Sequence, residues 1–154
     1  MELRLKELEI TSPAFSHLGA IPQRYTSDGE NISPPLEWDK VPPETQMLVL
    51  ICHDPDAPLP SGFTHWVLYN IPPSVKALEE NDGAQFTQGV NTLEEEGYTG
   101  PAPPPNHGRH HYYFWLYALK ENIDVGEGWT REFLIEAIDP FVIAQARLVG
   151  TYER

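Results

Sequence analysis

The sequence has a single cysteine, Cys52, so a disulfide within the chain is excluded. Cys52 ends an apolar run over residues 48–52, where we expect a buried small hydrophobe rather than a reactive thiol. Apolar runs are short throughout the chain, whereas a membrane-spanning helix needs about 20 apolar residues. The sequence therefore predicts no membrane-spanning segment.

Basic residues are also scarce. The chain has 10 lysines and arginines against 23 aspartates and glutamates, which gives a formal net charge of -13. Because the basic residues form no cluster, we expect nucleic acids and anionic lipid surfaces to be repelled. Residues 1–6 lack the apolar core and the small-residue cleavage site of a secretory signal, which favours a cytoplasmic location.

Long helices are disfavoured by the 16 prolines. The length of 154 residues and the hydrophobic content of 40% fit one domain over residues 1–154. β-Branched and aromatic stretches bounded by Pro, Gly or Asp predict strands of a central sheet at residues 47–53, 63–71 and 111–119. Weaker patterns predict strands at 3–10 and 84–89. We expect a mainly β fold.

Helix signals occur only near the C-terminal end of the sequence. Thr130 can cap a helix over residues 131–138, and Asp139-Pro140 supplies a cap followed by proline at the first helical position. The next apolar residues lie at helical spacing and predict a second helix that ends at Gly150: Phe141, Ala144 and Leu148.

Three segments combine a rigid backbone with titratable side chains: residues 54–58, 64–66 and 98–112. Prolines at 55 and 58 hold Asp54 and Asp56 on a stiff turn after a strand. Such a turn more often simply ends a strand, and a histidine such as His65 in an aromatic strand is more often a satisfied side chain than a ligand. These two segments alone are weak indications of a site.

The third segment is more informative, because its proline-stiffened loop leads into a strand. Side chains alternate along a strand, so His110 and Tyr112 project to one face, while His111 and Tyr113 project to the other. One imidazole and one phenol can therefore share a pocket, and both can hydrogen-bond a phosphate.

Together these motifs resemble, in order and spacing, the phosphatidylethanolamine-binding, Raf-kinase-inhibitor-like family. They are Asp-Pro-Asp-Ala-Pro at 54–58, His-Trp at 65–66, Tyr-x-Gly-Pro-x-Pro-Pro at 98–104 and His-x-Tyr at 110–112. Further matches at 28–36, Trp38 and 117–119 extend the resemblance over about residues 10–152. The chain looks most similar to the compact bacterial and archaeal members.

The resemblance implies a large antiparallel sheet packed on a smaller one, with a few short peripheral helices and an anion pocket at one edge. That pocket would hold a phosphate-containing small molecule or a phospholipid headgroup, with no cofactor and no metal. Its residues here would be Asp54, Asp56, His65, Ala102, Pro103, Pro104, His110 and Tyr112. The chain departs from the family at Ala102, where many relatives have Gly or Cys, and at His111, where Arg is common.

A phosphate would be repelled by two carboxylates unless they face hydrogen-bond donors. We therefore expect at least one Asp to orient a histidine through a ring N–H, while the other ring nitrogen donates to the anion. Tyr112 can add its hydroxyl, and the loop near Ala102 a backbone N–H. Because a histidine donates from both nitrogens only when protonated, phosphate affinity should rise as pH falls from about 8 to 6.

The sequence leaves two other functions open. A metal site or an acid–base pair could be formed by Asp54, Asp56, His65, His107, His110 and His111. However, the neighbours His110 and His111 point apart on a strand. The sequence also has no His-Glu-x-x-His, paired Cys or Gly-x-Ser-x-Gly pattern. We expect binding rather than catalysis. The resemblance also implies inhibition of a protein kinase or serine protease, and it allows a homodimer because compact relatives often pair.

Overall fold

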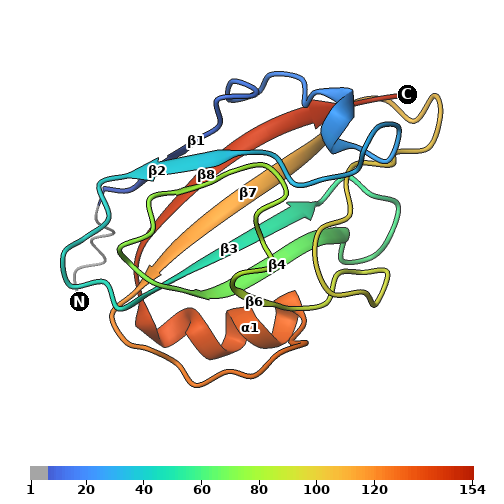
Figure 1. Ribbon diagram of the computed structural model, residues 1–154. Coiled ribbons are helices and arrows are strands. Elements are labelled where there is room, and N and C mark those ends of the chain that lie inside the picture. Colours follow the sequence, from blue (N-terminus) through green and yellow to red (C-terminus); the bar gives the residue numbers. More distant parts are fainter. Residues whose placement is uncertain (1–6) are drawn as a thin grey trace.

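The computed structural model describes residues 7–154, which form two antiparallel sheets with one α-helix (Figure 1). The five-stranded sheet has the order β6-β4-β3-β7-β8, and the three-stranded sheet has the order β1-β2-β5. In chain order the elements are β1 (Glu9–Thr11), η1 (Gln23–Tyr25), β2 (Leu36–Asp39), β3 (Met47–Asp54), β4 (Phe63–Ile71), β5 (Ala77–Leu78), β6 (Thr87–Gln88), β7 (His110–Leu119), α1 (Arg131–Ile138), η2 (Asp139–Phe141) and β8 (Val142–Tyr152). The expected mainly β architecture of a large and a small sheet is confirmed.

The large sheet is covered on both faces. One face packs on the small sheet through a core that includes Leu48, Leu50 and Trp38, and the other packs on α1 through Val49 and Leu134. All residues of β3 are consequently buried. A strand buried on both faces reads as a continuous apolar run rather than an alternating one, which explains the sequence of residues 47–52.

The strands expected at residues 47–53, 63–71 and 111–119 correspond to β3, β4 and β7. Of the weaker predictions, 84–89 contains only the short β6, and 3–10 overlaps β1 at Glu9 and Ile10. Residues 3–6 of the prediction at 3–10 lie outside the described part of the chain. The helix at Arg131–Ile138 is confirmed, and the Thr130 hydroxyl caps it by accepting from the N–H of Phe133.

The second predicted helix is wrong. Asp139–Phe141 forms only a 3-10 turn, and the chain then continues as β8, which pairs with β7 from Val142 to Tyr152. Ala144 and Leu148 are four residues apart, a spacing that places them on one face of a helix and equally on one face of a strand. Pairing with the whole length of β7 decides the outcome, and both side chains enter the core beneath the small sheet.

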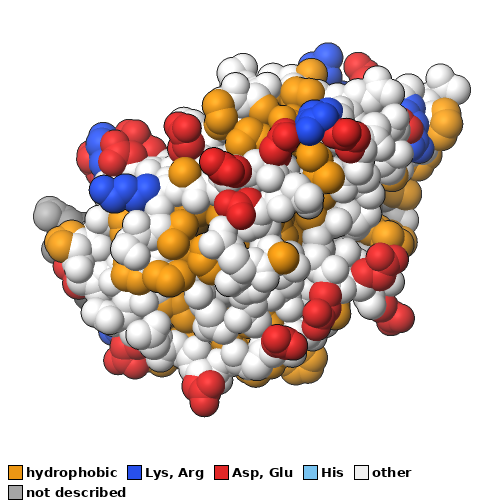
Figure 2. Space-filling view, viewed as in Figure 1, with side chains coloured by type: hydrophobic (Ala, Val, Ile, Leu, Met, Phe, Trp, Pro, Cys, Tyr) orange, Lys and Arg blue, Asp and Glu red, His pale blue; other side chains and the backbone are white. Residues whose placement is uncertain are grey.

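Acidic side chains are spread over the face seen in Figure 2, with few basic ones among them. This distribution agrees with the net charge of -13. No helix within residues 7–154 is long and apolar enough to cross a membrane.

Candidate functional site

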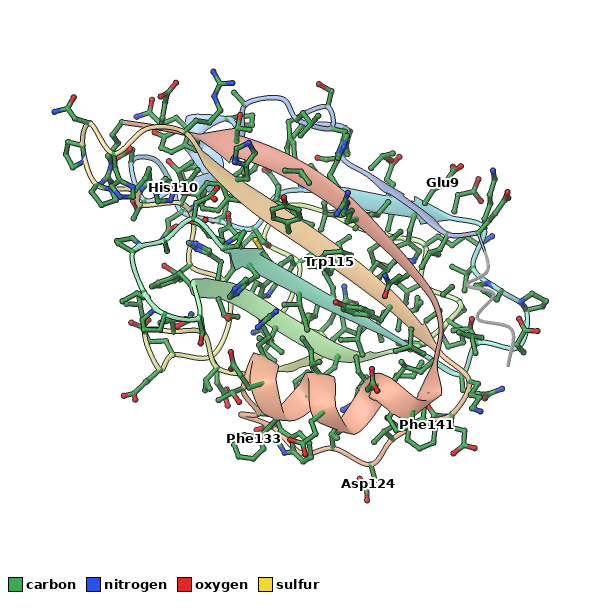
Figure 3. The ribbon with its side chains drawn as sticks, turned by 180° about the vertical axis from the view of Figure 1, so that it is seen from behind. Glu9, His110, Trp115, Asp124, Phe133 and Phe141 are labelled. Atoms are coloured by element: carbon green, nitrogen blue, oxygen red, sulfur yellow. The ribbon has the colours of Figure 1, made fainter. Side chains whose placement is uncertain are left out.

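The strand register brings three chain segments to one end of the large sheet. Asp54, the last residue of β3, pairs with Phe63, the first residue of β4, and β7 begins at His110. Because β4 and β7 both run antiparallel to β3, their beginnings lie beside the end of β3, where Figure 3 shows His110 among the loops. Residues far apart in the sequence therefore meet at this edge.

A cavity of about 310 Å³ opens at this edge, at the lower end of the range for small-molecule pockets, which is about 300–1,000 Å³. All the site residues expected from the sequence except Asp56 line it: Asp54, His65, Ala102, Pro103, Pro104, His110 and Tyr112. The rest of the wall includes Leu59, Phe63 and Leu93. The site residues that the resemblance implied therefore line one cavity, with the exception of Asp56.

Asp56 lies outside the cavity lining. Its carboxylate accepts hydrogen bonds from the backbone N–H of His111 at 2.8 Å and from His111 Nδ1 at 2.9 Å. Partial burial acts to raise the pKa of Asp56, but the hydrogen bonds from His111 outweigh it and hold that pKa below its ordinary value. Asp56 therefore ties the turn after β3 to the opposite face of β7.

Asp54 holds His110 in a fixed orientation. The carboxylate Oδ2 lies 2.6 Å from His110 Nδ1, and both side chains are 3% exposed. Its other oxygen accepts the backbone N–H of Asp56 at 2.7 Å. Burial raises the pKa of the Asp54 carboxyl, although the hydrogen bonds from His110 and Asp56 act in the opposite direction. An ionised Asp54 can only accept, so His110 carries a proton on Nδ1.

The other nitrogen of His110 also has a partner. His110 Nε2 lies 2.7 Å from Nδ1 of His107, an exposed residue of the loop before β7. A chain of hydrogen bonds therefore runs from His107 through His110 to Asp54.

His65 is oriented by the backbone instead of by a carboxylate. Its Nδ1 donates to the carbonyl oxygen of Thr99 at 2.6 Å, which leaves Nε2 of the neutral ring without a proton. Burial lowers the pKa of His65 to about 4, so this ring is neutral at physiological pH. The ring packs edge-on against Tyr112, with centroids 5.2 Å apart. His65 is thus a wall of the cavity and a hydrogen-bond acceptor.

Tyr112 and Ala102 supply donors that have no partner. The Tyr112 side chain is buried, and its hydroxyl makes no hydrogen bond to any residue in 7–154. Burial raises the pKa of Tyr112 well above its ordinary value, so the hydroxyl keeps its proton. Ala102 is the one residue between positions 101 and 105 that is not proline, and its backbone N–H has no partner within the described chain.

Contacts from distant segments fix the loop that carries Ala102. The side-chain oxygen of Asn31 accepts the N–H of Gly100 at 2.7 Å, and Arg154 Nη1 donates to the carbonyl of Pro103 at 3.2 Å. A Cβ on Gly100 would lie 2.3 Å from the carbonyl oxygen of Tyr25, so only glycine allows this approach. The proline-rich loop is consequently held at a defined distance from the strands.

The mouth of the cavity is apolar. Leu59 and Leu93 line it from two different loops, and their exposed fractions are 47% and 53%. These two side chains therefore place apolar surface beside the polar groups of the cavity.

Sequence reasoning missed these leucines and gave no binding role to His107, Asn31 or Arg154. His107 was considered only for a metal site or an acid–base pair. Among residues 7–154 no group of three or more His, Cys, Asp or Glu is arranged to hold a metal ion. The signal available for Asn31 was its place in the segment 28–36, which already matched the family.

Comparisons with known proteins show the family and the fold of the chain. The family model described as phosphatidylethanolamine-binding protein matches residues 11–153. A UPF0098 protein of Methanothermobacter thermautotrophicus is 47% identical over 96% of this chain and 99% of its own length.

Two solved structures share the fold closely. A phosphatidylethanolamine-binding protein homolog from Chlamydia trachomatis has a TM-score of 0.91 at 43% identity, covering 97% of this chain and 99% of its own. Escherichia coli YbcL, described as a member of the mammalian family, has a TM-score of 0.90 at 30% identity, covering 96% and 99%. The chain therefore belongs to the phosphatidylethanolamine-binding protein family.

Proposed function

We propose that the cavity at the end of β3 binds an oxyanion, either a phosphate or an O-phosphorylated headgroup. The observation that carries this proposal is the pair of unpartnered donors, the hydroxyl of Tyr112 and the N–H of Ala102, which adjoin one small cavity. Ala102 is exposed, and the Tyr112 hydroxyl is not among the buried unpaired groups of residues 7–154, so water can reach both donors. The charged oxygens of an oxyanion accept stronger hydrogen bonds than water does, which favours replacement of water by the anion.

The site can accept an anion although the protein is acidic. Asp54, a cavity residue that would repel an anion, is engaged by His110 and by the N–H of Asp56. When His110 takes a second proton, Asp54 stabilises the resulting imidazolium, and Nε2 becomes a charge-assisted donor. The anion would then meet Tyr112, Ala102 and His110 from different sides.

Binding without turnover is the second part of the proposal. Among the described residues that line the cavity there is no serine, cysteine or lysine to act as a nucleophile, and the hydroxyl of Thr99 has no hydrogen bond to a histidine that could activate it. Cys52 is 1% exposed, and burial raises the pKa of its thiol well above the ordinary value. The wild-type protein should therefore not hydrolyse p-nitrophenyl phosphate over hours. A contaminating phosphatase would give a signal at once in the same assay.

Calorimetry with inorganic phosphate and with phosphorylethanolamine tests the binding proposal. Tyr112→Phe removes one hydroxyl that faces the cavity and should weaken both ligands about tenfold, because hydrogen bonds to charged groups contribute about 1.5–3 kcal/mol. Tyr113→Phe is the matched control, since Tyr113 lies on the other face of β7 and is not among the cavity residues. Equal affinities for the wild type and Tyr112→Phe would contradict the proposal.

The source of the phosphate can be distinguished in the same way. Vesicles that contain phosphatidylethanolamine, compared with vesicles of phosphatidylcholine alone, test whether a headgroup in a bilayer reaches the cavity. Selective binding that free phosphate displaces would identify a lipid headgroup. Binding of free phosphate with no vesicle association would identify a small soluble ligand.

A further inference from the structure

In this structure His110 offers no free donor to a ligand. Its Nδ1–H is committed to Asp54 at 2.6 Å, and its Nε2 lies 2.7 Å from Nδ1 of His107. In the neutral ring Nε2 is therefore the acceptor, and His107 Nδ1–H is the donor. An imidazole nitrogen has one in-plane direction for a hydrogen bond, and His107 occupies it.

We propose that His107 is a built-in competitor of the ligand: its imidazole takes the place beside His110 Nε2 that an oxyanion would occupy. An anion reaches His110 only after His107 moves aside. This inference rests on the proposed function, since it concerns the same cavity. An oxygen bonded to Nε2 would lie about 2.7–3.2 Å from it, which is where His107 Nδ1 stands.

The loop around His107 is built to allow this movement. The side chain of His107 is exposed, and Gly108 follows it at a φ of 92° with no heavy atom of the described chain within 4 Å of a Cβ position. On the preceding side, the N–H of Asn106 donates to the carbonyl of Arg154 at 3.2 Å. The N–H of His107 donates to the carbonyl of Pro104 at 3.3 Å, so the imidazole can swing out by rotation of its own side chain while the backbone of the loop keeps its place.

Competition by His107 lowers the affinity for the anion but does not abolish binding. The donors of Tyr112 and Ala102 are open to an anion whether or not His107 is in place. Apparent affinity falls in proportion to the fraction of molecules in which His110 is free. The contact with His107 is one hydrogen bond, so its removal should tighten binding about two- to tenfold.

Calorimetry with inorganic phosphate near neutral pH tests the inference on the full chain. His107→Ala should bind phosphate about two- to tenfold more tightly than the wild type. His111→Ala is the matched control, because His111 is also an exposed histidine but pairs with Asp56 outside the cavity lining, and it should stay within about twofold of the wild type. Unchanged or weaker binding in His107→Ala overturns the inference.

Imidazole ¹⁵N spectra give a second test, because a purely structural role of His107 would leave them unchanged when phosphate binds. On saturation with phosphate, His107 Nδ1 should lose its hydrogen-bonded shift, while the environment of His110 Nε2 changes from a ring partner to an anion. Spectra in which His107 keeps its bond to His110 at saturation overturn the inference.

His110→Ala separates failure of this inference from failure of the proposed function. If neither the wild type nor His107→Ala binds phosphate, the proposed function fails and the inference with it. If the wild type binds and His110→Ala weakens binding, but His107→Ala brings no gain, only the role of His107 is wrong.

Discussion

The carboxylate of Asp54 and the imidazole of His110 form a buried pair, joined at 2.6 Å with each side chain 3% exposed. They come from β3 and β7, whose pairing runs as far as His53 with Tyr113, and Asp54 and His110 lie one and three residues beyond that pair at the same end of the sheet. The pair fixes which nitrogen of His110 is directed away from Asp54. The chemistry of the cavity therefore depends on strand register as much as on residue type.

Asp54→Asn tests the electrostatic part of this pair. An amide of the same shape can still accept from His110 Nδ1–H through its oxygen, although its NH2 group then faces the N–H of Asp56 and that second hydrogen bond is lost. The amide cannot stabilise the imidazolium that donates to an anion. Phosphate affinity near pH 6 should fall about tenfold, and the rise in affinity between about pH 8 and 6 should become shallower. Isothermal calorimetry at the two pH values measures both effects.

The control for this variant is Asp56→Asn, which alters a neighbouring carboxylate that pairs with His111 outside the cavity lining. Its phosphate affinity should stay within about twofold of the wild type. Tighter binding by Asp54→Asn would mean that repulsion between the carboxylate and the anion outweighs support of His110.

Gly100→Ala tests the position of the proline-rich loop. The new Cβ would meet the carbonyl oxygen of Tyr25 at 2.3 Å, so either the loop or residues 23–25 must shift. We expect a loss of about 1–3 kcal/mol in the free energy of unfolding and at least a tenfold loss in phosphate affinity, because Ala102 moves with the loop. Gly126→Ala, where no atom lies within 4 Å of the new Cβ, should change neither urea stability nor affinity.

Much of this site could be predicted from the sequence because a strand has a period of two. The alternation that placed His110 and Tyr112 on one face and His111 on the other holds in β7, where the burial of successive residues alternates. Side-chain spacing did not identify β8 as a strand, because Ala144 and Leu148 fit one face of a helix and one face of a strand equally well. Only pairing with β7, which is remote in sequence, distinguishes the two.

Loop residues could not be placed in the same way. A turn stiffened by proline fixes the backbone but not the direction of a side chain, so Asp56 was expected beside Asp54 and instead accepts from His111. Asn31 accepts from Gly100, which is 69 residues away, so its contact depends on tertiary packing that no local pattern encodes. His107 contacts His110 only three residues on, but the loop before β7 has no regular geometry from which the direction of its side chain could be predicted.

The buried histidines His53 and His65 predict how stability depends on pH. Burial lowers the pKa of each to about 4, whereas an unfolded histidine titrates near 6.5. Between these values the unfolded chain binds more protons than the folded chain, so the free energy of unfolding falls as pH falls from about 6.5 to 4. The loss should reach about 2–3 kcal/mol per histidine, and Asp54 opposes it because burial raises its pKa.

Urea denaturation at several pH values across this window measures the effect. His53→Gln removes one titrating ring, whose Nδ1 lies 3.0 Å from the hydroxyl of Thr64, and replaces it with a neutral amide. The variant should be less stable than the wild type near pH 7 but should lose less stability on acidification. Parallel curves for the two proteins would show that His53 does not contribute to the acid sensitivity.

The exposed leucines at the cavity mouth predict a preference among phosphate esters. Leu59 and Leu93 can cover an apolar group attached to the anion, at about 25 cal/mol for each Å² removed from water. Phenyl phosphate should therefore bind more tightly than inorganic phosphate, and Leu93→Ser should abolish most of this difference while leaving the affinity for inorganic phosphate within about twofold. Leu18→Ser, which changes an equally exposed leucine that is not among the cavity residues, should keep the full preference. If Leu93→Ser weakens both ligands equally, the leucine supports the shape of the cavity and does not contact the substituent.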